Sequence, residues 1–280
     1  EDPAHDHDAA QVIHLTPESR KLIGLQTQPA HTGSLETAIR LTGKIRLNED
    51  TVAHVVPYVS GIVRRVTHTV GSTVTGGQTM AVIHSRQLAR ARADYLAAVQ
   101  HCELARTVYE RERSLHRENI SSEQEFLQAQ MEFNEAEINR MQARQTLFAM
   151  GFDQARLDRL PVSDRQDFLK YDITAPFDGV VIDKHITLGE VVRDDTPVFT
   201  VADLSSVWID LDVFSEDLPV VQEGQTCHIT VGDQSLEAAI DFLSPVLDPK
   251  TRTATARIIA DNPDRSLRPG LFVTATLYET

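Results

Sequence analysis

The feature that most constrains the fold is a glycine spacing that occurs in two distant segments of the chain. Gly61 and Gly71 have the same separation as Gly179 and Gly189, and in each copy a valine follows three residues after the second glycine. The copies align without a gap over more than twenty residues. Glycine permits the positive φ of tight turns, and the intervening valines and isoleucines favour strands. Each copy therefore predicts a strand–turn–strand–turn–strand unit, and two such units packed face to face predict a small β-sandwich.

Between the two copies the composition changes to that of helices. Residues 86–118 contain no Gly or Pro and are rich in Ala, Arg, Glu and Leu, which favour helix. A break follows, after which Ser122 and Glu125 fit a capping box at the start of a second helix. Gly151 supplies a stop for that helix. The sequence therefore predicts a helical hairpin inserted between the two halves of a β-domain.

Apolar residues recur at heptad spacing in both predicted helices. The first stripe is Leu88, Tyr95, Cys102 and Tyr109 with Ala91, Ala98 and Ala105, and the second is Leu127, Asn134, Met141 and Phe148 with Met131 and Ile138. Narrow stripes with charged residues on the other faces indicate that each helix buries mainly against the other. We expect an antiparallel coiled coil whose arms reach roughly 50 Å at ~1.5 Å per residue.

The last part of the chain predicts a small antiparallel β-barrel. Residues 206–213 alternate apolar and polar side chains, as a half-buried strand does. Further short strands are expected at 227–231, 235–243, 253–260 and 271–278, with turn-forming residues between them. Residues 35–47 are expected to add a strand to this barrel or to another β-unit near the termini, and residues 11–34 to contain further strand.

Composition excludes several classes of function. The formal net charge of −14 and the pI near 5.2 argue against nucleic acid as the main partner. No stretch approaches the ~18 consecutive apolar residues of a membrane span. We find no phosphate loop, no His-Glu-x-x-His helix and no nucleophile elbow, so we expect no enzyme. Cys102 and Cys227 are interpreted as two small apolar residues, with nothing in favour of a disulfide.

Several segments together carry a family resemblance. They are Thr174–Val181, Asp203–Trp208, Asp248–Thr253, Asn262–Pro263 and Leu267–Leu271. On these segments the chain resembles the periplasmic adaptors, or membrane fusion proteins, of resistance-nodulation-division (RND) efflux pumps. His185–Glu190 and the Leu-Ser-Ser-Val-Trp run are similar to the heavy-metal branch, of the cobalt–zinc–cadmium and copper–silver kind.

The resemblance implies a mainly β, elongated and modular chain with a long α-helical hairpin. The expected parts are a disordered tail at 1–10, a partial membrane-proximal β-domain at 11–34, a β-barrel at 35–51 and 204–280, a split lipoyl-like β-sandwich at 52–85 and 171–203, and the hairpin with its return at 86–170. We expect the C-terminal half of the membrane-proximal domain to be absent from this sequence.

The resemblance also implies a function and its partners. Such an adaptor links an inner-membrane proton-driven RND transporter to an outer-membrane channel, and it self-associates into a ring. The expected location is the periplasm of a Gram-negative cell, associated with the inner membrane. Family adaptors dock to the channel through a hairpin tip carrying Arg, then Leu four residues on, then Ser seven further, and Arg111, Leu115 and Ser122 match this pattern.

The N-terminal tract offers a possible metal site. His5, His7 and His14, with nearby aspartates, provide imidazole and carboxylate ligands that suit zinc, cobalt or cadmium better than copper(I). A solvated tail is the alternative interpretation of the same residues. No cofactor is required, and a divalent metal is expected to bind transiently at most.

Two other functions fit parts of the sequence. A lipoyl or biotinyl carrier needs a modifiable lysine at the junction of the two half-repeats, but Lys184 lies within the second copy. A periplasmic metal-delivery protein acting on the pump is compatible with the adaptor hypothesis.

Overall fold

The computed structural model describes residues 15–24, 26, 29, 38–160 and 168–278. The chain divides into two units, a small one formed by the N-terminal residues to Ala38 with the last three residues, and a large one from Ile39 to Leu277. In the small unit the described element is helix α1 (Pro17–Leu22), which has no buried residue. Strand was predicted for this part of the chain, and for residues 17–22 that prediction is wrong.

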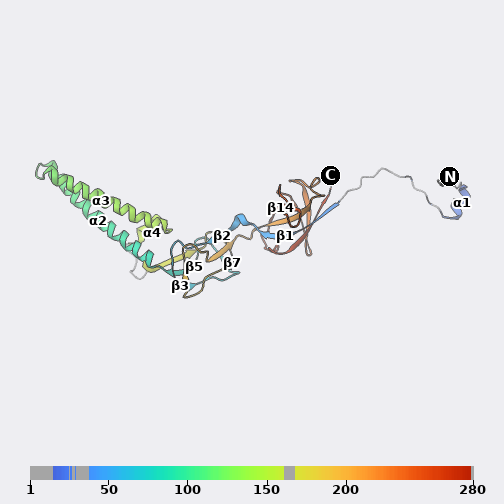
Figure 1. Ribbon diagram of the computed structural model, residues 1–280, viewed down its shortest axis with the longest axis horizontal. Coiled ribbons are helices and arrows are strands. Elements are labelled where there is room, and N and C mark those ends of the chain that lie inside the picture. Colours follow the sequence, from blue (N-terminus) through green and yellow to red (C-terminus); the bar gives the residue numbers. More distant parts are fainter. Residues whose placement is uncertain (1–14, 25, 27–28, 30–37, 161–167, 279–280) are drawn as a thin grey trace, which may run out of the picture. The chain divides into compact units, whose positions relative to one another are not determined.

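The large unit holds the remaining elements (Figure 1). Its helices are α2 (Arg86–Arg117), α3 (Glu123–Ala149) and α4 (Gln154–Arg159), with a 3-10 turn at Glu49–Thr51. Its strands are β1 (Ala38–Leu47), β2 (Val52–Val55), β3 (Gly61–Val66), β4 (Thr73–Val74), β5 (Thr79–His84), β6 (Lys170–Thr174), β7 (Gly179–Lys184), β8 (Val191–Val192), β9 (Phe199–Ala202), β10 (Ser206–Phe214), β11 (Thr226–Val231), β12 (Gln234–Ala239), β13 (Phe242–Leu243), β14 (Thr253–Asp261) and β15 (Phe272–Tyr278).

The two sequence repeats form two four-stranded sheets that exchange strands. One sheet has the order β2-β9-β7-β4 and the other β6-β5-β3-β8, so each contains strands from both sides of the helical insertion. The exchange is reciprocal: Gly61 lies opposite Val192, and its repeat equivalent Gly179 lies opposite Val74. Neither half can complete a sheet alone, and the two segments therefore fold as one sandwich.

Backbone hydrogen bonds of the turn glycines fasten this exchange. Gly189 N donates to Val63 O at 3.0 Å, and Gly71 N donates to Val181 O at 2.8 Å. Both glycines have positive φ, +87° for Gly71 and +85° for Gly189, a region that side chains with a Cβ rarely adopt. The repeat found in the sequence is thus a repeated hydrogen-bonding position.

The helical hairpin leaves and re-enters the sandwich at adjacent strands. His84, at the end of β5, lies opposite Lys170, at the start of β6. Buried Ser85 caps α2 by accepting a hydrogen bond from Leu88 N at 3.3 Å. Apolar residues from the lower hairpin and from α4 share one core with the sandwich strands; those of the helical part are Leu88, Ala91, Tyr95, Leu147, Met150, Phe152, Leu157 and Leu160.

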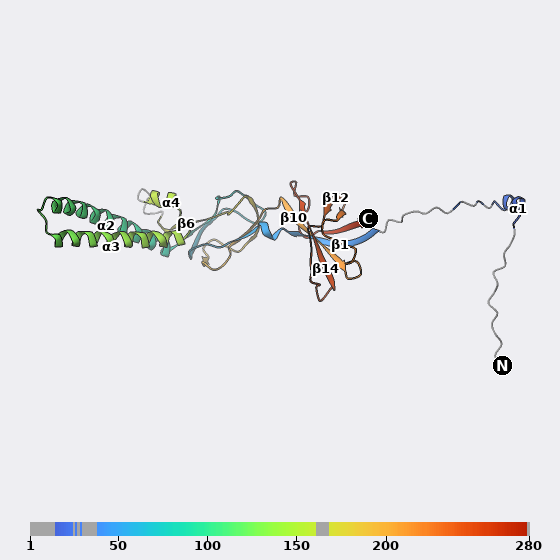
Figure 2. The ribbon, with the colours of Figure 1, turned by 90° about the horizontal axis from the view of Figure 1, so that it is seen from above.

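Helices α2 and α3 run side by side in both views (Figures 1 and 2). The predicted α2 stripe is largely confirmed, because Leu88, Ala91, Tyr95 and Cys102 are buried. The predicted α3 stripe is wrong. Its members Leu127, Met131, Ile138 and Met141 are 52%, 58%, 59% and 49% exposed, whereas the buried residues of α3 are Ala129, Ala136 and Leu147.

The error in α3 has a simple cause. Two heptad patterns run along this helix two residues apart, and the sequence does not say which of them faces α2. The inner pattern contains Phe126, Phe133 and several alanines. Alanine lets two helix backbones approach closely, while the aromatic rings fill the wider gaps between them. The aliphatic pattern is left on the opposite side, where it faces solvent.

The remaining strands form a seven-stranded antiparallel sheet of order β12-β11-β15-β1-β10-β14-β13. Strand β1 joins it by pairing with β10, so residues from both sides of the sandwich contribute to this sheet. Alternating side chains of β10, β11, β14 and β15 are buried and build a second core. Asn262, 1% exposed, closes one end of it by donating from its amide to Leu204 O and Leu267 O.

We predict that alanine at either strand glycine destabilises the sandwich. A Cβ at Gly61 would lie 2.7 Å from His84 O, and one at Gly179 would lie 2.7 Å from Ala202 O. Overpacking against backbone costs about 1–3 kcal/mol, so Gly61→Ala and Gly179→Ala should each lower the free energy of unfolding by that amount in urea titrations. Gly76→Ala is the control, because its Cβ would meet nothing closer than 3.4 Å. Equal stability of all three variants would contradict the close backbone approach at Gly61 and Gly179.

Candidate functional site

The turn between α2 and α3 is built by a helix-ending motif. Asn119 has φ of +56°, its N–H donates to His116 O at 3.0 Å, and Ile120 N donates to Leu115 O at 2.9 Å. This pair of bonds is a Schellman motif, which satisfies the last carbonyls of a helix and reverses the chain. Asparagine tolerates the left-handed conformation better than other non-glycine residues. The local sequence thus fixes where the hairpin turns.

The start of α3 is fixed by the predicted capping box, which the structure confirms. Ser122 Oγ accepts from Glu125 N at 3.3 Å, and Glu125 Oε2 accepts from Ser122 N at 2.9 Å. The Ser122 hydroxyl also donates to Glu125 Oε2 at 2.8 Å. Hydrogen bonds from Ser122, and from the Ser121 hydroxyl, lower the pKa of Glu125 below its ordinary value.

A polar network connects the two helices across the tip. Arg111 binds Glu112 Oε1 through Nε at 3.3 Å and Nη2 at 3.1 Å. The other carboxylate oxygen, Glu112 Oε2, accepts from Ser121 Oγ at 2.9 Å. The Ser121 hydroxyl also lies 3.3 Å from Glu125 Oε2. The Glu112 carboxylate therefore contacts both Arg111 of α2 and Ser121, which lies just before the start of α3.

Stacked rings support this network from within the hairpin. His116 stacks on Phe126 with ring centroids 5.0 Å apart, and Tyr109 stacks on both Phe126 and Phe133 at 5.9 and 5.5 Å. Such pairs stabilise beyond the area they bury. Each helix carries two of these rings, spaced by one heptad. A search for aromatic residues at heptad spacing would therefore have found them in the sequence.

The three predicted docking residues all lie toward this end of the hairpin: Leu115 and Ser122 flank the turn, and Arg111 lies in the last two turns of α2. The Arg111 side chain is 67% exposed, Leu115 is half-buried, and Ser122 is exposed. The Ser122 hydroxyl both donates and accepts within the capping box, so in this structure it stabilises the start of α3. Sequence reasoning missed Glu112 and Ser121, and it also missed Ile120, whose side chain is 68% exposed at the apex.

The predicted metal ligands His5, His7 and His14 lie outside the described residues, and that hypothesis stays a prediction. Among the residues that the structure does describe, no group of three or more His, Cys, Asp or Glu side chains is placed to hold a metal ion. Burial raises the pKa of the Cys227 thiol to about 11, so it is protonated at neutral pH. Cys102 and Cys227 are both free and buried.

Lys184, the residue considered for a carrier function, is engaged in the sandwich. Its Nζ donates to Ile186 O at 3.0 Å. The connection between the two half-repeats, where a carrier presents its lysine, is occupied by α2 and α3. Within the described part of the chain, no helix combines the length and the apolar character needed to cross a bilayer.

Interlocked half-motifs with an inserted helical pair, followed by a β-barrel, define a barrel-sandwich hybrid protein. Residues 51–203 match the family model "CzcB-like, barrel-sandwich hybrid domain", and residues 206–280 match "CusB-like, beta-barrel domain". The first match covers more than half of the sequence, so the chain belongs to the CzcB-like family. This family consists of membrane fusion adaptor proteins and not of enzymes.

Named relatives agree with this assignment. The chain is 38% identical over 269 residues to the cobalt-zinc-cadmium resistance protein CzcB of Cupriavidus metallidurans, which covers 95% of this chain and 50% of the relative. It is 25% identical over 254 residues to the nickel and cobalt resistance protein CnrB of the same organism, and this match covers 90% of this chain and 61% of the relative. The chain thus spans about half the length of the first of these relatives.

Solved structures share the fold. ZneB from Cupriavidus metallidurans superposes with a TM-score of 0.57 at 26% identity, covering 88% of this chain and all of that one. A MacA–MexA chimera containing the MexA α-hairpin domain of Pseudomonas aeruginosa superposes with a TM-score of 0.65 at 23% identity. The superposition covers 89% of this chain and 83% of the chimera.

We predict that the capping network sets the pKa of Glu125. A carboxyl whose folded pKa is lowered stabilises the fold above its unfolded pKa and loses this contribution as pH falls through the folded pKa. In Ser122→Ala, which lacks the hydroxyl donor, the pKa of Glu125 should rise toward its ordinary value. Carboxyl-carbon NMR titration measures this shift, and Ser114→Ala, an exposed serine of α2, is the control. An unchanged Glu125 titration in Ser122→Ala would argue against the network.

Proposed function

We propose that this chain is the adaptor part of a tripartite heavy-metal efflux pump and links an inner-membrane RND transporter to an outer-membrane channel. The observation that carries the proposal is the sandwich built from two interlocked halves, since it holds a helical hairpin without interrupting either sheet. The 38% identity to a cobalt-zinc-cadmium resistance protein supports a divalent cation as the exported substrate. The adaptor acts in the periplasm, associated with the inner membrane.

In this proposal the hairpin is an antiparallel coiled-coil arm whose tip binds the channel. The tip offers an exposed guanidinium at Arg111, in the last two turns of α2, and an exposed aliphatic side chain at Ile120, on the turn that the Schellman motif and the capping box hold rigid. A rigid tip loses little conformational entropy on binding, which favours affinity. Leu115 is the half-buried apolar neighbour, and Ser122 contributes by fixing the start of α3.

A chimera tests the function in a complete pump. The segment of Cupriavidus metallidurans CzcB that aligns with this chain is replaced by residues 11–278, and growth of the host is measured in cobalt, zinc and cadmium. We expect the chimera to restore resistance. The chimera carrying Arg111→Glu should lose resistance and cross-linking to the outer-membrane channel, because the substitution reverses the charge of an exposed contact.

Arg90→Glu is the matched control, since Arg90 is an exposed arginine of the same helix that lies near its base and pairs with Asp94. Circular dichroism of both variants checks that the helices are intact. A chimera that folds and reaches the periplasm without conferring resistance would refute the adaptor assignment. Full resistance with Arg111→Glu would refute tip docking through this residue.

We also propose that the hairpins of neighbouring copies pack against each other in a ring. The outer seam of α3, defined as Leu127, Met131, Asn134, Ile138 and Met141, keeps a strict four–three heptad spacing although it does not face α2. A helix with two heptad seams on opposite sides suits packing between two other helices. Three glutamines flank the outer seam: Gln124, Gln130 and Gln142. Burying an uncharged amide costs less free energy than burying a charged side chain at the same position.

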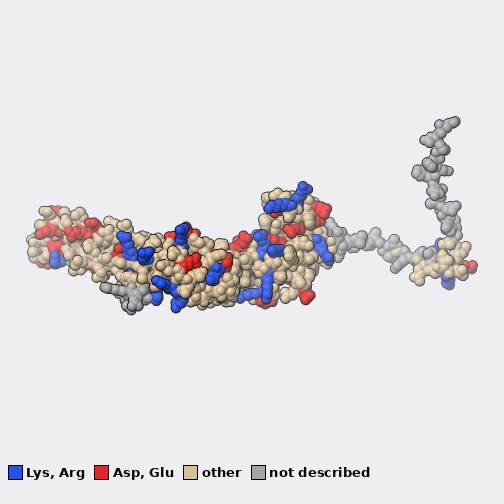
Figure 3. Space-filling view, turned by 60° about the horizontal axis from the view of Figure 1, so that its bottom comes forward, with Lys and Arg blue, Asp and Glu red and all other residues tan. Residues whose placement is uncertain are grey.

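The opposite net charges of α2 and α3 favour a second copy of this chain as the partner, with α3 of one copy against α2 of the next. Helix α2 carries seven arginines and four acidic residues, a formal balance of +3, whereas α3 carries five glutamates and two arginines, a balance of −3. In the space-filling view, acidic side chains gather over the end of the hairpin (Figure 3). Two α3 helices would repel each other, so α3 of one copy should face α2 of the next. A heterologous contact of this kind forms a ring when the rotation between successive copies closes.

We predict that polar substitutions in the outer seam weaken self-association. Burying one apolar side chain contributes about 1.5–3 kcal/mol, so Met131→Gln with Ile138→Gln should raise the dissociation constant at least tenfold in sedimentation experiments. Asn139→Ala, an exposed change on α3 away from both seams, should leave it unchanged. An oligomer as tight as the wild type in the double variant would exclude this surface as the contact.

A further inference from the structure

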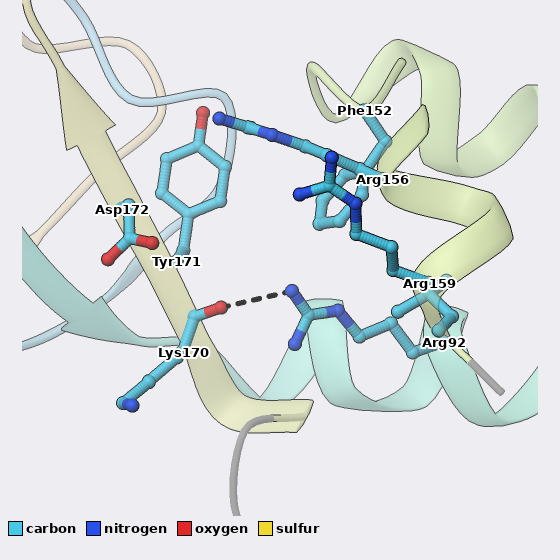
Figure 4. Close-up of a pocket in the computed structure, with 8 residues that line it drawn as sticks. Arg92, Phe152, Arg156, Arg159, Lys170, Tyr171 and Asp172 are labelled. Carbon is cyan, nitrogen blue, oxygen red and sulfur yellow. Dashed lines mark hydrogen bonds between the residues drawn. The ribbon is translucent and has the colours of Figure 1, made fainter. Parts of the chain in front are cut away.

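The two helices of the hairpin are attached to the sandwich in different ways. Strand β5 continues directly into α2 through buried Ser85, whose N–H donates to Leu169 O at 2.9 Å. Two turns along α2, Arg92 Nη2 donates to Lys170 O at 3.2 Å, as Figure 4 shows. The start of α2 is therefore fixed covalently to β5 and by hydrogen bonds to the chain at the start of β6.

The end of α3 has no such direct continuation, because residues 150–169 separate this helix from β6. It closes in a Schellman motif, in which Gly151 N donates to Phe148 O at 2.9 Å and Phe152 N donates to Leu147 O at 3.1 Å. Leu147 and Phe152 are buried in the core that the hairpin shares with the sandwich. Apolar burial is not directional, so it holds the end of α3 against the sandwich without selecting one angle.

A tyrosine of the sandwich packs directly on the end of α3. Tyr58 lies in the loop between β2 and β3, and a Cβ at Gly151 would lie 2.8 Å from Tyr58 Cδ2 and 3.0 Å from Tyr58 Cε2. The ring therefore occupies the space that a side chain at position 151 would fill. A hydrogen bond joins the Tyr58 backbone to the hydroxyl of Tyr171, which is 7% exposed on β6. The loop that carries the ring is thus anchored to a buried residue.

The two helix ends of the hairpin show what requires glycine at position 151. Gly151 has φ of +80°, and Asn119, at the same position of the Schellman motif that ends α2, has φ of +56°. Asparagine tolerates this conformation, so the backbone of the motif does not by itself demand glycine. The close approach of the Tyr58 ring does demand it, because the ring leaves no space for a Cβ.

We propose that Tyr58 is a strap that fixes the direction of the hairpin by holding the end of α3, with Ser85 as the pivot at the start of α2. While the ring lies on Gly151, the hairpin keeps one direction, and when the ring leaves, the hairpin swings about Ser85. Tyr58 is 63% exposed, so its release uncovers little apolar area and leaves the shared core intact. The strap acts in the free chain and does not depend on the proposed pump.

The length of the hairpin amplifies any movement at its root. Helix α2 has 32 residues and extends about 48 Å at ~1.5 Å per residue. Packed helices lie about 8–10 Å apart, so a displacement of about 1 Å at the end of α3 becomes about 5 Å at the tip. A small change at Tyr58 therefore changes where the tip residues lie.

Double electron–electron resonance between two spin labels on the 280-residue chain tests the proposal. The labels are attached at Arg64→Cys, an exposed position of β3, and at Ser114→Cys, an exposed position near the tip, while buried Cys102 and Cys227 stay unlabelled. We expect a narrow distance distribution with the native Tyr58. Tyr58→Ala should widen this distribution at least twofold, whereas Tyr58→Phe, which keeps the ring, should leave its width unchanged.

Variants at position 151 locate the effect. Gly151→Asn permits the positive φ but displaces the ring, so it should widen the distribution as Tyr58→Ala does, and the two changes together should widen it no further. Gly224→Asn is the control, because Gly224 has φ of +82° and its Cβ would meet nothing within 4 Å. Circular dichroism checks that each variant folds, and if Gly151→Asn does not, the comparison of Tyr58→Ala with Tyr58→Phe decides. The proposal is overturned if Tyr58→Ala or a folded Gly151→Asn keeps the wild-type width, or if either control widens it equally.

Discussion

The reciprocal backbone pairing between the two half-motifs is the interaction on which the rest of this structure depends. Strand β3 of the first half needs β8 of the second, and β7 of the second half needs β4 of the first. Because the halves complete each other's sheets, the chain between β5 and β6 carries no strand of the sandwich. It can be of any length as long as it starts and ends at adjacent strands, as His84 and Lys170 do.

The inserted helices pack differently at the root of the hairpin and beyond it. Their lower turns pack Leu88 and Leu147 into the sandwich core, which anchors the hairpin at its root. Beyond the root, α2 and α3 bury mainly small and aromatic side chains against each other, and the aliphatic residues of α3 stay on the surface. A pair of helices stabilised from within can expose such residues at modest cost, and exposed apolar residues at regular spacing are typical of interaction surfaces.

Electrostatics divides the hairpin into regions with different properties. The tip is organised by carboxylates, with Glu112 and Glu125 holding the polar network between the helices. The root is organised by guanidinium groups around Phe152. Because these groups are separated by the length of the helices, salt screens each region from the other.

The sequence alone determined the interrupted β-domain, the positions of both helix starts, the turn between them and the family. These features depend on local chemistry or on spacing: glycines where φ must be positive, a serine and a glutamate three residues apart, and runs without Gly or Pro. It also indicated Arg111, Leu115 and Ser122 as neighbours at the tip. Their role in docking is still a prediction.

Only the tertiary structure decided which face of α3 meets α2. Both heptad patterns, two residues apart, are present in the sequence of α3. The choice between them depends on how closely two helix backbones can approach. The contact between Arg92 and Phe152 at the root of the hairpin likewise joins residues that no local pattern relates. Contacts between distant residues are set by packing, and packing is a property of the whole fold.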